Sequence, residues 1–234
     1  MVVTSLSQVV MLVVNDMAFV ANMGDSKLVL CRRRKQKGKK PGKGPPLTDE
    51  DVGGDGGAGA ATKHSFAWTS KGSAASTPPD ADALPLTQDH KPILLAEKSR
   101  IEAAGGKVVG GRVNSAIEVA RSFGDLGFKK FGVVALPDLR VKFKLGPAEE
   151  FALLACDGLW SRYTEAAACA FLRTRFYSKT TWCQGREHGP WTGERGARAL
   201  VEDAVHAKGT TDNCSAMVVA FRHPDASPPF DLAE

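Results

Sequence analysis

The chain has 234 residues, of which 43% are hydrophobic and 24% charged, and its formal net charge is +5. These proportions supply enough apolar material for one core and exclude a fibre or a coiled coil. The longest apolar stretch, residues 9–14, ends after six residues, far short of the roughly 20 that a membrane span requires, so we expect no contact with a membrane.

Two short β-prone segments open the chain. Residues 9–14 and 18–23 are apolar, and the Asn15-Asp16 pair between them is typical of a hairpin turn. We expect a second hairpin to begin at Gly24-Asp25-Ser26, with residues 27–31 as its outgoing strand.

A long segment of low complexity follows at residues 32–83. It is rich in Lys, Gly, Pro, Ala and Ser and shows no sustained period, so it cannot bury enough apolar surface to offset its ordering entropy. We therefore predict a disordered insert that separates two parts of one domain, residues 1–31 and 84–222, with residues 223–234 as a tail.

The positive charge is local to this insert. Residues 31–46 carry eight Lys or Arg and no acid, so the rest of the chain has a net charge of −3, and we expect no specific nucleic-acid partner. The run at 32–40 fits either a nuclear address or a solvated tether. The five cysteines are odd in number, widely spaced and without a C-x-x-C pattern, which favours a reducing compartment, so the expected location is the cytoplasm, the nucleus or both.

Order returns at residues 84–87. A helix is predicted over residues 93–104, with Leu94, Leu95, Ile101 and Ala104 on one stripe, and Gly105-Gly106 ends it. Short β-like pieces follow at 107–109, 111–113 and 117–120, and residues 122–137 read as an irregular excursion.

The last third contains both strands and helices. The unbroken apolar run at 151–155 predicts a strand buried on both faces. Thr164 is a suitable N-cap for a helix through residue 176, and a second helix is predicted at 197–207 before a final strand at 215–221. In that second helix the residues expected to face inward are Leu200, Val201, Ala204 and Val205. Because strands and helices are grouped rather than alternating, the fold class is α+β, a layered sandwich.

Three aspartates stand where a strand meets a turn: Asp25, Asp157 and Asp212. A carboxylate at the end of a buried strand loses hydration and persists when a cation or hydrogen-bond donors neutralise it. Several at one sheet edge would suit Mg²⁺ or Mn²⁺. Taken singly, each could equally cap a turn.

The order of the motifs along the chain favours the cation-site interpretation of these aspartates over the capping interpretation. The chain contains, in sequence, Ala-Asn-Met-Gly-Asp-Ser-Lys-Leu-Val-Leu (21–30), Pro-Leu-Thr-Gln-Asp-His-Lys-Pro (85–92), Glu97 through Arg100-Ile-Glu-Ala-Ala-Gly-Gly (to 106), Gly-Arg-Val-Asn (111–114), Glu-Val-Ala-Arg-Ser-Phe-Gly-Asp (118–125), Pro-Asp-Leu-Arg-Val (137–141), Phe-Ala-Leu-Leu-Ala-Cys-Asp-Gly-Leu-Trp (151–160) and Gly-Thr-Thr-Asp-Asn-Cys-Ser-Ala-Met-Val-Val (209–219). This series resembles the type 2C (PPM) metal-dependent serine/threonine protein phosphatases. Phe-Lys-Lys-Phe-Gly-Val (128–133) resembles the integrin-linked-kinase-associated branch.

The resemblance implies an α-β-β-α sandwich of two antiparallel sheets flanked by helices, with a two-metal centre between the sheets. Asp157 and Asp212 match ligands of the first metal, and Asp25 matches a ligand of a weakly held third ion. In such a centre a hydroxide bridging the metals attacks phosphorus in line. The implied substrates are phosphoserine and phosphothreonine proteins, and we expect a monomer.

The chain departs from the family pattern at its N-terminus. The family's acidic pair, its phosphate-binding arginine and the Asp-Gly-His motif that supplies the bridging carboxylate and a general acid have no counterpart. The chain therefore corresponds to the C-terminal two-thirds of the family domain, and low activity is expected. The alternatives are a catalytically inactive binding or regulatory module, or an internal methionine at position 1.

Three other patterns invite chemical readings. Cys156 and Arg162 have the C-x5-R spacing of a thiolate phosphatase, but Asp157, Leu159 and Trp160 suit an anion-binding loop poorly, so we expect Cys156 to be a small buried core residue. Residues 105–111 match neither glycine-rich phosphate motif and read as a helix stop and hairpin turn. His90 is expected to be structural.

Overall fold

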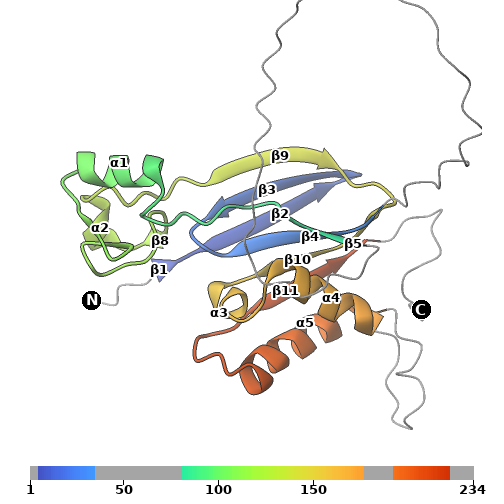
Figure 1. Cartoon of the computed structure of the whole chain (residues 1–234). Helices are drawn as coiled ribbons and strands as arrows, with labels where there is room; N and C mark the ends of the chain where they lie inside the picture. The colour runs from blue at the N-terminus through green and yellow to red at the C-terminus, as the bar shows by residue number, and fades with distance from the viewer. Residues whose placement is uncertain (1–4, 35–80, 177–191, 222–234) are drawn as a thin grey trace, which may run out of the picture.

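Two antiparallel sheets face each other in the computed structural model, which describes residues 5–34, 81–176 and 192–221 (Figure 1). The three-stranded sheet has the order β2 (Gln8–Val14), β3 (Met17–Met23) and β9 (Asp138–Lys144). The four-stranded sheet has the order β11 (Ala216–Ala220), β10 (Glu149–Ala155), β4 (Lys27–Arg33) and β5 (Ala81–Pro85). The expected α+β sandwich is confirmed. Strand β9 was not predicted.

The first hairpin is as predicted, and the second is not. Strands β2 and β3 pair from Val14 with Met17 back to Gln8 with Met23, and Asn15 has the positive φ of 57° that a tight turn requires. Strand β4, however, pairs with β10 and β5 and never with β3. Residues 24–26 therefore carry the chain from one sheet to the other.

The composition of β4 explains this crossing. All four residues from 28 to 31 are buried, with Leu28 and Leu30 between the two sheets and Val29 and Cys31 under the helices. A strand with two apolar faces needs a layer on each side. It can find these layers only at the centre of the sheet that separates helices from the other sheet.

Helices α4 (Glu165–Phe176) and α5 (Gly193–Glu202) cover the outer face of the four-stranded sheet (Figure 1). Thr164 caps α4 as predicted, its Oγ1 accepting from the N–H of Ala167 at 3.2 Å. Residues Asp203–Ala207 continue α5 as a π-helical turn. Leu200 and Ala204 are buried as predicted, but the wider turn leaves Val205 37% exposed, so its predicted inward orientation is wrong.

The outer face of the three-stranded sheet bears no helix among the described residues (Figure 1). On β2, β3 and β9 this face carries large apolar side chains that are 40% to 79% exposed: Val10, Leu12, Val14, Phe19 and Leu139. Patches of this kind normally mark a surface that another element or chain covers. One sheet of the sandwich is thus fully layered and the other is covered on its inner face.

A smaller subdomain of short elements lies beside the two sheets (Figure 1). It contains α1 (Leu95–Ala103), α2 (Leu126–Lys129), the hairpin of β6 (Val108–Val109) and β7 (Arg112–Val113), and β8 (Phe123–Gly124), which pairs with β1 (Ser5–Leu6). The glycines behave as predicted, since Gly105, Gly110 and Gly111 all have positive φ at the helix stop and the hairpin turn.

The buried face of α1 differs from the prediction. Leu95 is 81% exposed, whereas Glu97 and Ile101 are almost fully buried. Glu97 accepts from Arg100 Nη2 at 2.6 Å and from Arg121 Nη2 at 2.6 Å. Burial raises the pKa of the Glu97 carboxyl, but these hydrogen bonds outweigh it and hold that pKa below its usual range. A paired carboxylate therefore takes the position that the leucines were expected to fill.

We expect Glu97→Gln to destabilise the chain, because the substitution removes the carboxylate that Arg100 and Arg121 share and leaves Arg121 with Asp138 alone. At pH 7 the free energy of unfolding should fall by about 2–3 kcal/mol, which is below the range for fully buried ion pairs because both arginines retain some water. This loss corresponds to a decrease of about 5–10 °C in melting temperature. Because the pKa of Glu97 is lowered in the folded state, the ionised carboxylate stabilises the fold at pH values above the ordinary glutamate pKa near 4.3. This stabilisation is lost as the pH falls through the lowered pKa. The difference from wild type should therefore shrink below about pH 4.

The matched control is Glu102→Gln, on the same helix, which removes a half-exposed carboxylate paired with Lys98. It should change the melting temperature little, since exposed pairs contribute little to stability. Equal effects of the two substitutions in thermal unfolding monitored by circular dichroism would contradict the structural role given to Glu97.

The predicted insert lies mostly outside the described residues, as does the predicted tail. The flanking strands extend into its predicted range, because β4 continues to Arg33 and β5 begins at Ala81. Within the part of the chain that the structure describes, no helix has the length and apolarity needed to cross a bilayer.

Candidate metal centre

The strand register of the four-stranded sheet gathers the candidate residues at one end. Lys27 at the start of β4 pairs with Ala155 at the end of β10, and Ala155 pairs with Ala216 at the start of β11. The residues just beyond these three positions therefore emerge at the same sheet edge. They are the three aspartates that the sequence singles out: Asp25, Asp157 and Asp212.

Two of the aspartates are held by their own loops. Asp157 opens the short helix α3 (Asp157–Trp160), and its Oδ1 accepts from the N–H of Gly158 at 3.0 Å. Asp212 Oδ1 accepts from the N–H of Asn213 at 2.7 Å. Gly158 also lies directly against the second loop, because a Cβ at this position would stand 2.1 Å from the carbonyl oxygen of Asn213. The absence of a side chain lets the two loops meet.

The carboxylates interact electrostatically. Partial burial raises the pKa of the Asp157 carboxyl, and the negative charges of Asp25 and Asp212 raise it further. Like charges held together in this way cost free energy until a cation neutralises them. Asp25, Asp157 and Asp212 thus belong to one electrostatic neighbourhood, as the prediction of a shared site requires.

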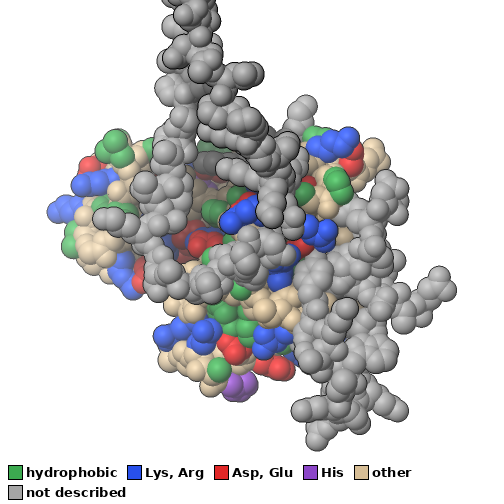
Figure 2. All heavy atoms as spheres, turned by 45° about the vertical axis from the view of Figure 1, so that its right-hand side comes forward, with side chains coloured by type: hydrophobic (Ala, Val, Ile, Leu, Met, Phe, Trp, Pro, Cys, Tyr) green, Lys and Arg blue, Asp and Glu red, His purple; other side chains and the backbone are tan. Residues whose placement is uncertain are grey.

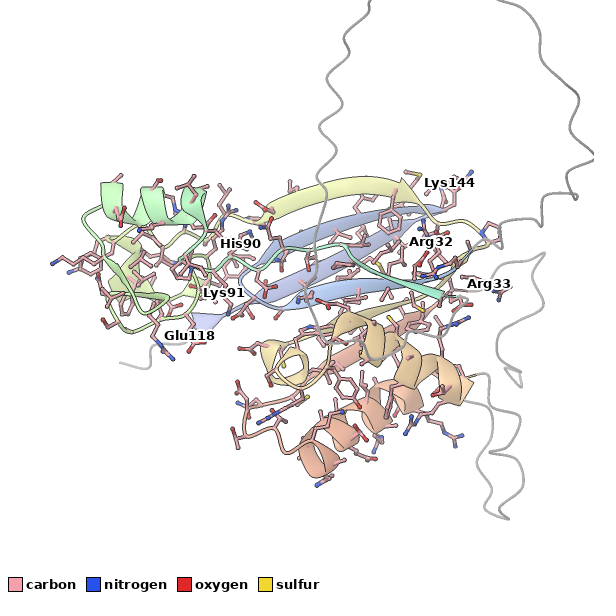
Figure 3. The ribbon with its side chains drawn as sticks, in the orientation of Figure 1. Arg32, Arg33, His90, Lys91, Glu118 and Lys144 are labelled. Carbon is pink, nitrogen blue, oxygen red and sulfur yellow. The ribbon has the colours of Figure 1, made fainter. Side chains whose placement is uncertain are left out.

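Asp25 already has a cationic partner, which the sequence analysis missed. Lys91 Nζ donates to Asp25 Oδ2 at 2.6 Å, and the Asp25 side chain is only 7% exposed. Figure 3 shows Lys91 and His90 beside the sandwich, at the end opposite to Arg32, Arg33 and Lys144. The three basic residues at that far end are thus remote from the aspartates.

A second ion pair borders the same edge. Lys27 Nζ lies 2.8 Å from Glu165 Oε1 and 5.6 Å from the ring centroid of Trp160. Asp89 is close to both lysines, yet its Oδ1 is buried without a hydrogen-bond partner among the described residues. Burial raises the pKa of Asp89 against the attraction of Lys27 and Lys91. The Asp-His-Lys order of residues 89–91 was the available signal for these groups.

His90 has the structural role that we expected. Its Nδ1 accepts from the N–H of Gly24 at 3.1 Å, and its Nε2 lies 3.2 Å from Asp138 Oδ2. Nδ1 is thus hydrogen-bonded, whereas Nε2 lies near a carboxylate without hydrogen-bond geometry, and His90 has only 2% exposure. The imidazole joins the turn between the sheets to the start of β9.

The thiolate reading of Cys156 is not supported by the loop around it. Residues 157–160 form a helix instead of an anion-binding loop, and Arg162 Nη2 donates to the carbonyl of Gly209. Cys156 Sγ donates to the carbonyl of Asn213 and accepts from the N–H of Ser215, both at 3.2 Å. Cys156 is half-buried at the sheet edge, so its expected place in the core is wrong.

The donor chemistry of the edge fits a hard divalent cation in part. Asp157 and Asp212 offer carboxylate oxygens, and the Oδ1 atom of Asp89, whose charge acts together with that of Asp25, is buried without a hydrogen-bond partner among the described residues. Among the described residues, however, no three such side chains converge closely enough to enclose an ion. Asp157 and Asp212 could supply part of a centre that needs further ligands.

Gly158→Ala tests the contact between the two aspartate loops. The added methyl group would displace the carbonyl of Asn213, and with it the neighbouring Asp212. We expect a loss of about 1–3 kcal/mol in stability, as for other overpacked sites, together with weaker Mn²⁺ binding in calorimetry. Gly127→Ala is the control, because a Cβ there meets nothing within 4 Å. Unchanged Mn²⁺ binding in the Gly158 variant would show that the contact does not position Asp212.

Comparisons with known proteins agree on one family. The family model described as Protein phosphatase 2C matches residues 78–214. The chain is 32% identical over 215 residues to "Probable protein phosphatase 2C 8" of Arabidopsis thaliana, with 90% of the chain and 48% of the relative covered. It is 30% identical over 213 residues to the human "Integrin-linked kinase-associated serine/threonine phosphatase 2C", with 91% and 43% covered.

The fold is also that of a solved structure. The crystal structure of a serine-threonine phosphatase 2C from Toxoplasma gondii superposes with a TM-score of 0.59 at 20% identity, covering 93% of this chain and 58% of that one. The chain spans about half the length of the curated relatives it matches.

Proposed function

Since the chain belongs to the protein phosphatase 2C family, we propose that its protein hydrolyses phosphoserine and phosphothreonine esters in proteins with Mg²⁺ or Mn²⁺ as cofactor. The observation that supports this most directly is the strand register that sets Asp25, Asp157 and Asp212 at one sheet edge. The raised pKa of Asp157, caused by partial burial and by the two neighbouring carboxylates, is the charge pattern of a cation site.

Each residue has a proposed task in this reaction. Asp157 and Asp212 would hold the first cation, and Gly158 keeps their two loops in contact. Asp25 would take up a more weakly held ion, for which Lys91 is a neighbour. Bound divalent cations would offset charge on the phosphoryl oxygens and lower the pKa of a water molecule that acts as the nucleophile. No cysteine takes part.

The second candidate function is a catalytically inactive module that binds phosphoproteins or regulates another enzyme. It is favoured by the absence, among the described residues, of three ligating side chains that could enclose an ion. Figure 2 shows acidic and basic side chains of described residues beside one another over the middle of one face. For both candidates we propose a monomer in the cytoplasm, the nucleus or both.

Calorimetric titration with Mn²⁺ tests the cation site. The chain should bind Mn²⁺ weakly, and the double substitution Asp157→Asn, Asp212→Asn should abolish the heat, because it removes the only two charges proposed for the first ion. Asp16→Asn is the control, since Asp16 pairs with Lys144 at the opposite end of the sandwich. Equal binding by the chain and the double variant would remove the metal-site proposal.

Phosphatase assays separate the two candidate functions. The 234-residue chain should turn over a phosphoserine peptide far more slowly than a chain extended upstream by the missing motifs, since each absent polarising group costs about 10²–10³-fold, and the losses need not add. Activity of the extended chain should disappear with Asp157→Asn and persist with Cys156→Ser. An extended chain that is inactive with Mn²⁺ would favour the binding module.

A further inference from the structure

Lys91 contacts one of the three aspartates, and hydrogen bonds of the neighbouring backbone fix its position. The N–H of His90 donates to the carbonyl of Gly24 at 2.9 Å, while Gly24 N–H donates to the His90 ring. Two further bonds hold the same segment, from Asn22 Nδ2 to the Gln88 carbonyl and from Leu28 N–H to Thr87 Oγ1. These four hydrogen bonds hold residues 87–90 against residues 22–28, and they therefore place Lys91 beside Asp25.

The Lys91 side chain makes a specific contact from this position. Its Nζ lies 2.6 Å from Asp25 Oδ2, the Lys91 side chain is 34% exposed, and that of Asp25 is 7% exposed. A buried carboxylate without a counter-ion would be costly. Lys91 thus neutralises Asp25 in the absence of any other cation.

Carboxylates lie around the Lys91 ammonium. Burial lowers the pKa of Lys91, but the hydrogen bond to Asp25 and the negative charges of Asp25, Asp89 and Glu118 outweigh it, so the net shift is upward. Figure 3 shows Lys91 and Glu118 on the same side of the molecule. The positive charge also reaches Asp157, whose pKa it lowers in opposition to the neighbouring carboxylates.

We propose that the Lys91 ammonium is a tethered cation that occupies Asp25 and sets how weakly this carboxylate takes up a divalent ion. A divalent ion that approaches Asp25 must displace the ammonium or bind beside it against charge repulsion. Lys91 then competes with the divalent ion at Asp25, which it contacts directly, and acts only more weakly on Asp157. This inference rests on the proposed function, which assigns Asp25 to the cation centre.

Mn²⁺ binding measured by electron paramagnetic resonance tests the proposal, because the free aquo ion is counted directly and activity is not needed. Lys91→Met removes the charge and keeps an apolar stem, and it should tighten the weakest class of Mn²⁺ sites by about tenfold, the effect of roughly 1.4 kcal/mol of repulsion. Lys91→Arg keeps the charge and should bind as the wild type does. Lys98→Met, on an exposed lysine paired with Glu102, is the control for loss of one positive charge.

The double variant Asp25→Asn, Lys91→Met should not show the tighter Mn²⁺ binding of Lys91→Met, because the carboxylate that Lys91 neutralises is then absent. Thermal unfolding gives a second readout. Lys91→Met should melt below the wild type without metal, and excess Mn²⁺ should restore more stability to it than to the wild type. A lysine with only a structural role would lower the melting temperature without this difference in rescue.

The outcomes separate this inference from the proposed function. Identical Mn²⁺ binding by the wild type and Lys91→Met, with binding still lost on Asp157→Asn, Asp212→Asn, would overturn the role of Lys91 and leave the cation centre standing. No Mn²⁺ binding by any variant would overturn both. A Lys91→Met chain that stays unfolded in saturating Mn²⁺ would also overturn the inference, since the divalent ion would then be unable to replace the ammonium.

Discussion

The register of strand β10 between β4 and β11 is the constraint on which the candidate site depends. Ala155 pairs with Lys27 on one side and Ala216 on the other, so the turn before β4, the helix after β10 and the loop before β11 all meet at one edge. A shift of one residue would turn each side chain to the opposite face. Such a shift is costly here because β10 alternates between two cores, with Leu153 under the helices and Ala152 between the sheets.

The motif residues divide into those that face the site and those that build its support. Glu97, Arg100 and Arg121 form a partly buried ionic network in the small subdomain. Arg121 also reaches Asp138, which in turn lies beside His90. These contacts join the subdomain to the segment that carries Lys91. Some charged residues of the motifs therefore have a structural role. Only the folded structure distinguishes them from the charged residues that a ligand can reach.

The two sheets of the sandwich differ in what covers them. The four-stranded sheet packs its outer face on α4 and α5, where the ring of Phe176 meets Phe151 edge to face at 5.5 Å. A second tie is the buried ion pair between Arg173 and Glu150. The outer face of the three-stranded sheet has no such layer among the described residues, although its side chains are as apolar as a core face. The sequence of β2 therefore fits a strand with apolar surroundings on both sides.

The sequence by itself determined several local elements and the family. The Asn15-Asp16 turn, the apolar run of β10, the Thr164 cap and the glycine stops depend on neighbours within a few residues, so their patterns are readable along the chain. The eight motifs in order identified the family because their sum is specific even though each is weak. Asp25, Asp157 and Asp212 were also visible, because each follows or precedes a strand.

Only the tertiary structure decided which of these elements meet. Nothing in residues 24–26 indicates that the chain changes sheets, since pairing of β4 with β10 depends on residues more than 100 positions away. The burial of Glu97 instead of Leu95 depends on Arg121 arriving from another segment. The contact of Lys91 with Asp25 joins residues 66 positions apart. Long-range pairing and charge neutralisation leave no periodic trace in sequence, and so the ionic partners of the site appeared only once the chain was folded.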